Sequence, residues 1–120
     1  MIELELRDIL SPDVEPDRWE PKSPAVWVLL QLEIGVRGEV PCDTFSVMVA
    51  TPEGLLEHAT PDADGVLTKR GTIVLREFSW NVVRRVLSGI LAQCRAENWQ
   101  QAVPKLQRYF LWEFEDYIQE

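Results

Sequence analysis

The chain has 120 residues, a hydrophobic fraction of 46% and a formal net charge of −8. A chain of this length buries about two-thirds of its unfolded surface, so we expect a single domain over residues 1–120. The negative charge excludes nucleic acid and anionic membranes as favoured partners and favours a basic protein partner, unless it serves solubility alone.

The first segment, residues 1–10, is predicted to be a strand. Ile2, Leu4 and Leu6 alternate with charged residues, which is the pattern of a strand with one solvated face. Charges this early do not fit a signal peptide, and no apolar run approaches the ~20 residues of a membrane helix. The two cysteines, Cys42 and Cys94, show no metal or disulfide spacing. These features predict a cytoplasmic protein with free thiols.

Residues 11–24 form a long connection whose four prolines prevent both helix formation and sheet pairing. The connection is acidic, with carboxylates that include Asp13, Asp17 and Glu20. Trp19 is its one large apolar side chain. It either folds back to seal a sheet edge or inserts into a partner, since Trp is enriched among the residues that dominate binding energy.

Two further strands are predicted over residues 25–36 and 44–50, joined as a hairpin by residues 36–43. One face of the first strand is entirely apolar and is assigned to a core that faces the helices, through Val26, Val28, Leu30, Leu32 and Ile34. The opposite face carries Trp27, Leu29, Gln31 and Glu33. In the second strand, Phe45, Val47 and Val49 alternate with Ser46, Met48 and Ala50.

A short helix is predicted over residues 53–58, with Thr51 as its N-cap and Pro52 at its first position. Residues 72–78 are predicted to form a fourth strand that leads directly into a long helix. His58, the only histidine, falls at the end of the short helix with no Ser or Cys pattern beside it. It is therefore interpreted as a surface residue near a helix C-terminus.

The stretch over residues 80–99 has the spacing of a one-sided helix, capped by Ser79 or Asn81. Its apolar stripe contains Val83, Val86, Leu87, Ile90, Leu91 and Cys94, and its polar side contains Arg84, Arg85, Ser88 and Arg95. Gly89 weakens the helix by roughly 1 kcal/mol relative to Ala and is interpreted as a point of close packing against another backbone.

The C-terminal stretch is predicted to form a second helix over residues 103–118, with Pro104 in its first turn. Residues 109–114 also tolerate a strand, and residues 98–102 form a separate turn or a kinked first part. The predicted fold is α+β, with an antiparallel sheet of about four strands and two or three helices packed on one face.

No catalytic, metal or cofactor site is expected from the sequence. It holds no phosphate-binding glycine loop and no dinucleotide fingerprint, and its carboxylate pairs lie in stretches that look solvated. Acidic Glu113, Glu115 and Asp116 near a helix C-terminus oppose the helix dipole, which suggests another use. The alternatives are a solvated helix face or internal bonds from Glu115 and Asp116 to Arg84 or Arg85.

Several short motifs resemble the immunity protein 8 family of bacterial polymorphic toxin systems. They are SPD at 11–13, W-x-P at 19–21, LLQLEIG at 29–35, F-x-V-x-V-x-TP at 45–52, Cys94, Trp99 and WEFEDY at 112–117. The likeness covers most of the chain and is least in residues 53–78. It implies a cytoplasmic, non-enzymatic protein that binds and neutralises the C-terminal domain of a cognate toxin, and it brings no catalytic residue.

Many such toxins are nucleases with basic sites, which an acidic protein can cover. We therefore expect the toxin-binding residues to be Asp13, Asp17, Trp19, Glu20, Glu113, Glu115 and Asp116. Alternatively, WEFEDY stabilises the fold, with Trp112 and Tyr117 buried, and the toxin contacts lie in loops such as residues 57–71. Competing functions are a non-catalytic adaptor or scaffold subunit that binds a basic protein, or a small enzyme or ligand-binding domain. A homodimer is also compatible with the sequence.

Overall fold

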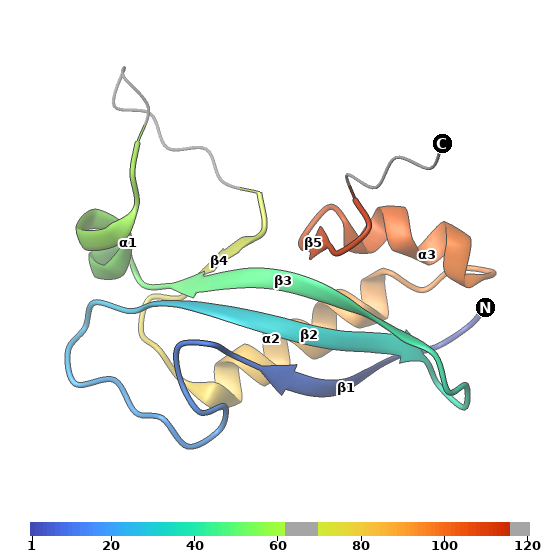
Figure 1. Cartoon of the computed structure of the whole chain (residues 1–120), viewed down its shortest axis with the longest axis horizontal. Helices are drawn as coiled ribbons and strands as arrows, with labels where there is room; N and C mark the ends of the chain where they lie inside the picture. The colour runs from blue at the N-terminus through green and yellow to red at the C-terminus, as the bar shows by residue number, and fades with distance from the viewer. Residues whose placement is uncertain (62–69, 116–120) are drawn as a thin grey trace.

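The computed structural model describes residues 1–61 and 70–115 and contains one sheet and three helices (Figure 1). In chain order the elements are β1 (Leu4–Leu10), β2 (Trp27–Val36), β3 (Cys42–Ala50), α1 (Pro52–His58), β4 (Thr72–Val74), α2 (Trp80–Gln93), α3 (Trp99–Leu106) and β5 (Leu111–Trp112). This arrangement confirms the predicted α+β class.

The strand order is β1-β2-β3-β4, and β5 pairs with a different part of β3 from β4. The predicted hairpin of β2 and β3 is confirmed, with Trp27 opposite Ala50 and Gly35 opposite Cys42. All pairs are antiparallel except β3 with β4, which is parallel and makes the sheet mixed. The fourth strand is shorter than residues 72–78, because pairing with β3 stops at Val74.

A β-bulge at Arg7 changes which residues of β1 face the core. Leu6 pairs with Ile34, Arg7 has no partner in the ladder, and Asp8 pairs with Glu33. The extra residue reverses the alternation, so Ile9 is buried with 4% of its surface exposed. Asp8 consequently lies on the opposite face of the sheet, which simple alternation from Leu6 does not predict.

The core lies between one face of the sheet and the helices α2 and α3. The apolar face predicted for β2 is confirmed, because Val26, Val28, Leu30, Leu32 and Ile34 are all buried. The predicted stripe of α2 meets it through Val83, Leu87, Ile90, Leu91 and Cys94, with Val86 packed partly against the same core. In Figure 1, α2 lies behind the strands.

Capping residues determine where α2 begins and where the next helix starts. Ser79 is the N-cap, and its hydroxyl accepts a hydrogen bond from the backbone N–H of Val82. The helix stops at Gln93 rather than continuing to residue 99, and Asn98 caps α3 separately.

The interpretation of Gly89 is wrong, because a methyl group there would have no non-local neighbour within 4 Å. Gly89 lies on the exposed side of α2.

The close backbone approach occurs instead at Gly54 in α1. A Cβ atom on Gly54 would lie 1.7 Å from the carbonyl oxygen of Val26, so only glycine fits. Thr51 caps α1 as predicted, accepting from the Gly54 N–H, and its hydroxyl oxygen also accepts from the Val26 N–H at 2.9 Å. These contacts attach α1 to the start of β2.

The predicted helix over residues 103–118 is wrong in its described part, because α3 begins at Trp99 and ends at Leu106. Phe110 is fully buried against Phe45, with ring centroids 6.4 Å apart. The chain then pairs with β3 through Leu111–Trp112. The alternative that residues 109–114 form a strand is therefore correct for these two residues. Burial of Phe110 and pairing of β5 thus replace further helical turns. Asp116, Tyr117 and Ile118 lie outside the described residues.

Candidate functional site: an open sheet face

The face of the sheet opposite the core is covered by none of the three helices that the structure describes (Figure 1). Its side chains on β2 are those predicted to point away from the core, and all of them are half-buried: Trp27, Leu29, Gln31 and Glu33. The ladder sets neighbours from β1, β3, β4 and β5 beside them. We call this surface the open face.

One end of the open face is acidic. Asp8 on β1 lies directly opposite Glu33 on β2, and Thr44 on β3 is the next residue across. The carboxylate of Glu113 accepts a hydrogen bond from the Thr44 N–H at 3.1 Å, which places it at the far edge of the same row. We call Asp8, Glu33 and Glu113 the acidic row. Like charges directly opposite each other destabilise a sheet, so the Asp8–Glu33 pair opposes folding.

The middle and other end of the open face are apolar. Leu10 and Leu111 stand at the two edges of one row and are 43% and 39% exposed. In the next row Leu29 lies beside Met48. The row after that contains Val74, which is 51% exposed. We call Leu10, Leu29, Met48, Val74 and Leu111 the apolar patch. Single exposed apolar residues are ordinary, but a group rimmed by polar residues is typical of a protein-binding surface.

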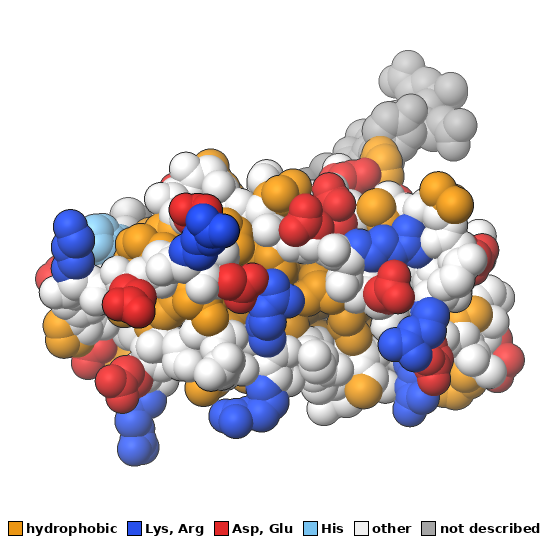
Figure 2. Space-filling model, turned by 90° about the horizontal axis from the view of Figure 1, so that it is seen from below, with side chains coloured by type: hydrophobic (Ala, Val, Ile, Leu, Met, Phe, Trp, Pro, Cys, Tyr) orange, Lys and Arg blue, Asp and Glu red, His pale blue; other side chains and the backbone are white. Residues whose placement is uncertain are grey.

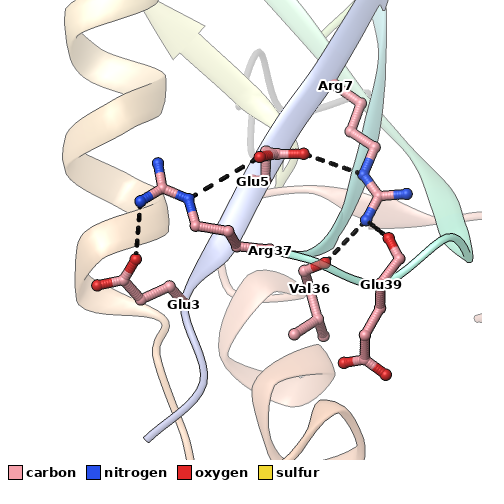
Figure 3. Close-up of polar contacts among 6 residues, drawn as sticks. All are labelled: Glu3, Glu5, Arg7, Val36, Arg37 and Glu39. Atoms are coloured by element: carbon pink, nitrogen blue, oxygen red, sulfur yellow. Dashed lines mark hydrogen bonds and ion pairs between the residues drawn. The ribbon is translucent and has the colours of Figure 1, made fainter.

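Arg7 closes the end of the sheet next to the acidic row (Figure 3). Its guanidinium crosses Gly35, where a Cβ atom would lie 2.9 Å from Nη2, and donates to the carbonyl oxygens of Val36 and Glu39. Its Nε lies 3.3 Å from a carboxylate oxygen of Glu5. Arg7 is therefore occupied in holding the β2–β3 turn, and its charge is balanced locally.

The proline-rich connection borders the open face at the β1 edge. Where β1 ends, the hydroxyl of Ser11 donates to the carbonyl oxygen of Leu29 at 2.7 Å, and the carboxylate of Asp13 accepts from the Leu29 N–H at 2.8 Å. These two side chains continue the edge of the sheet in place of a strand. Asp13 and Glu20 remain exposed to solvent.

Trp19 and Asp17 are both bound to other parts of the chain. Trp19 is half-buried against Phe78, with ring centroids 5.2 Å apart, and its carbonyl oxygen accepts from Nε1 of Trp80. Trp19 thus occupies the structural position that the sequence left as one of two options. The Arg84 guanidinium hydrogen-bonds Asp17 and holds the pKa of that carboxyl below its usual range.

The C-terminal stretch borders the opposite edge. Glu115 is bound by the guanidinium of Arg70, which together with a hydrogen bond from Gln107 lowers the pKa of its carboxyl to about 2. Its partner is thus Arg70, not Arg84 or Arg85 as considered from the sequence. Trp112 is half-buried, and its Nε1 donates to Asp43 at 3.0 Å. Of the seven expected toxin-binding residues, Asp116 lies outside the described residues.

The expected residues therefore do not form one cluster. Asp13 lies at the β1 edge of the sheet, whereas Glu113 lies at the opposite edge, where it belongs to the acidic row of the open face. Asp8, Glu33 and the apolar patch were not predicted as functional. The signal available in the sequence was the set of β2 residues that point away from the core, because it places Trp27 and Leu29 on the same face as Gln31 and Glu33.

Charge is divided unequally between the two layers of the molecule. Residues 1–61, which contain β1 to β3, hold twelve of the 20 Asp and Glu but only four of the 12 Lys and Arg. Residues 76–108, which contain α2 and α3, hold six Lys and Arg and two Glu. Within the elements themselves, β1 to β3 contain four carboxylates and one arginine, whereas α2 and α3 contain three Lys and Arg and no carboxylate, so we call them the acidic sheet layer and the basic helix layer.

The edge where β1 meets α2 has mixed charge. Figure 2 shows hydrophobic side chains there between charged side chains of both signs. A shallow groove at this edge includes Leu4, Leu6 and Leu91 in its lining. Its carboxylates are neutralised internally, since Arg37 lies 3.0 Å from Glu3. Among the described residues there is no group of three or more His, Cys, Asp or Glu suited to a metal ion.

Both cysteines are free; Cys94 is buried in the core, as predicted, and burial raises the pKa of its thiol. His58 is exposed at the C-terminus of α1, as expected. Within the part of the chain that is described, every helix is too short or too polar to traverse a lipid bilayer.

Comparison with known proteins identifies a family. A family model described as immunity protein 8 matches residues 4–117, which is nearly the whole chain and includes every element of the sheet. No curated protein and no solved structure gives a significant match.

Proposed function

The chain belongs to the immunity protein 8 family, which implies an immunity protein against a toxin, and we propose that it acts as a stoichiometric inhibitor. In this proposal it binds the C-terminal domain of a cognate polymorphic toxin in the cytoplasm and covers the active site of that domain. It carries out no reaction of its own.

We propose further that the toxin domain is a nuclease. Enzymes that bind nucleic acids hold phosphates with Lys and Arg, so their active sites are basic. The observation that supports this choice is the concentration of carboxylates in the sheet layer, against a basic helix layer. An acidic surface of this kind accelerates encounter with a basic site and disfavours other partners.

The expected binding residues divide into two roles in this proposal. Asp13, Glu20 and Glu113 are exposed and are proposed to contact the toxin directly. Asp17, Trp19 and Glu115 are engaged within the chain and are proposed to hold the connection and the C-terminal stretch in place. Asp116 stays a proposed contact.

The test is co-expression with the toxin domain encoded in the adjacent reading frame. We expect protection of the host cell, a complex of one copy of each chain, and an association rate that falls as salt is raised from 50 to 500 mM. A complex with a non-toxic basic protein, and none with the toxin, would favour an adaptor instead. The nuclease assignment fails separately if the bound toxin domain does not degrade DNA or RNA.

A further inference from the structure

We propose that the open face is the surface that receives the toxin, with the acidic row against cationic groups and the apolar patch against an apolar anchor of the partner. This inference rests on the proposed function, since it assigns the location of that binding. It adds the sheet surface to the contacts already proposed for Asp13, Glu20 and Glu113.

Charge supports this face over the others. A basic partner is repelled by the helix layer, where Lys and Arg outnumber Glu by six to two. At the edge between β1 and α2, the carboxylates of Glu3 and Glu5 are paired with Arg37. On the open face, by contrast, no ion pair is recorded within the described residues for Asp8, Glu33 or Glu113. Asp8 and Glu113 accept backbone hydrogen bonds, but within the described residues no cation in direct contact balances the charge of any of the three, so an incoming cation could do so.

Apolar exposure supports the same face. Leu10, Val74 and Leu111 are three of the seven large hydrophobic side chains that are exposed among the described residues. They come from three different strands, and the ladder brings them onto one surface around Leu29 and Met48. An apolar centre beside a charged margin is the usual organisation of a protein interface.

A second copy of this chain fits the open face less well than a basic partner. In a two-fold dimer through the acidic row, Asp8 and Glu33 would meet the same carboxylates of the partner copy. In a two-fold dimer through the apolar patch, the row would be buried against uncharged side chains, which is costly for unpaired carboxylates. Binding of a basic toxin avoids both penalties.

The experiment measures binding to the toxin domain from the adjacent reading frame, carrying a substitution that removes its catalytic activity. Glu33→Lys is compared with Glu97→Lys, which makes the same change in net charge on the helix layer. We expect Glu33→Lys to raise the dissociation constant at least about tenfold and Glu97→Lys to leave it within about twofold. Both variants are checked for folding by thermal denaturation.

The apolar patch is tested by replacing Leu10 and Leu111 together with Ala. The matched control is Leu56→Ala, because Leu56 is 87% exposed but lies on α1. We expect the double variant to weaken toxin binding by at least about tenfold and the control to leave it unchanged. Both patch residues are already partly in water, so their replacement should not prevent folding.

The outcomes separate this inference from the proposed function. If the wild-type chain binds the toxin and all open-face variants bind equally well, the location is wrong and the function stands. If the wild-type chain does not bind the toxin, the proposed function itself fails. If light scattering shows a wild-type dimer that Leu10→Ala with Leu111→Ala dissociates, the open face is an interface between copies, and the inference is overturned.

Discussion

Neutralising the carboxylate of Glu33 in the Asp8–Glu33 pair should stabilise the protein. The two residues are direct cross-strand neighbours, so their Cβ atoms are about 5 Å apart. At a carboxylate separation of about 6 Å, Coulomb repulsion in water is about 0.7 kcal/mol. Measured cross-strand charge pairs span about 0.2–1 kcal/mol, in agreement. We therefore expect Glu33→Gln to raise the free energy of unfolding by about 0.5 kcal/mol, or roughly 2 °C in Tm.

A double-mutant cycle isolates the repulsion from other effects. Asp8 also attracts the Arg84 guanidinium, whose pKa is raised chiefly by its hydrogen bond to Asp17 and to a lesser extent by Asp8. Asp8→Asn alone therefore loses an attraction together with the repulsion. In the cycle, Glu33→Gln should stabilise the wild-type background but not the Asp8→Asn background. The difference between the two effects is the pair energy.

Urea denaturation followed by tryptophan fluorescence measures all four proteins at low ionic strength. The same cycle in 1 M salt is the control, because a Debye length of about 3 Å removes most of the repulsion between exposed charges. Equal effects of Glu33→Gln in both backgrounds at low salt would refute the placement of the two carboxylates side by side. A pair energy that does not respond to salt would contradict its Coulombic origin.

Three further predictions concern the scaffold. Gly54→Ala should lower the free energy of unfolding by at least about 3 kcal/mol, because its Cβ would collide with the Val26 carbonyl. Gly89→Ala should raise the free energy of unfolding by about 1 kcal/mol, and urea denaturation measures both changes. Because the folded pKa of Glu115 is about 2, below its unfolded value, its bond to Arg70 stabilises above about pH 5 and is lost as pH falls toward 2. The stability difference between wild type and Glu115→Gln should accordingly be about 1 kcal/mol at pH 6 and vanish near pH 2; a constant difference would contradict it. Asp17→Asn should change the free energy of unfolding by less than about 0.5 kcal/mol, since both partners of its ion pair with Arg84 are nearly half exposed; a loss above 1.5 kcal/mol in the same urea experiment would contradict this.

Local patterns predicted the elements that pack on one side. The alternation in β2 and the stripe of α2 are properties of single segments, and both are buried as expected. The C-terminal stretch was mispredicted because its apolar spacing suits a helix, while contact with Phe45 and pairing with β3 determine the path of Phe110 and β5. Such contacts join residues far apart in the chain, so no periodicity in the segment reports them.

The candidate site was harder to predict for a related reason. Asp8 reaches the open face only because the bulge at Arg7 adds a residue, and a bulge leaves no pattern in the strand itself. Leu10, Leu29 and Leu111 come together only once strand order and register are known. The sequence therefore indicated acidic segments, whereas the surface between them depends on the pairing of five strands.

The distribution of charge over the molecule distinguishes a binding surface from charge that serves only to keep the protein soluble. A chain that needed charge only to stay soluble would gain equally from carboxylates on either layer, and would avoid setting Asp8 opposite Glu33 where they oppose folding. Here the helix layer is basic, and the repulsive pair lies on the sheet face that none of the described helices covers. A cation from a partner would relieve the repulsion on binding. Substitutions in the acidic row should accordingly move folding stability and toxin affinity in opposite directions, which a purely structural or solubilising role does not explain.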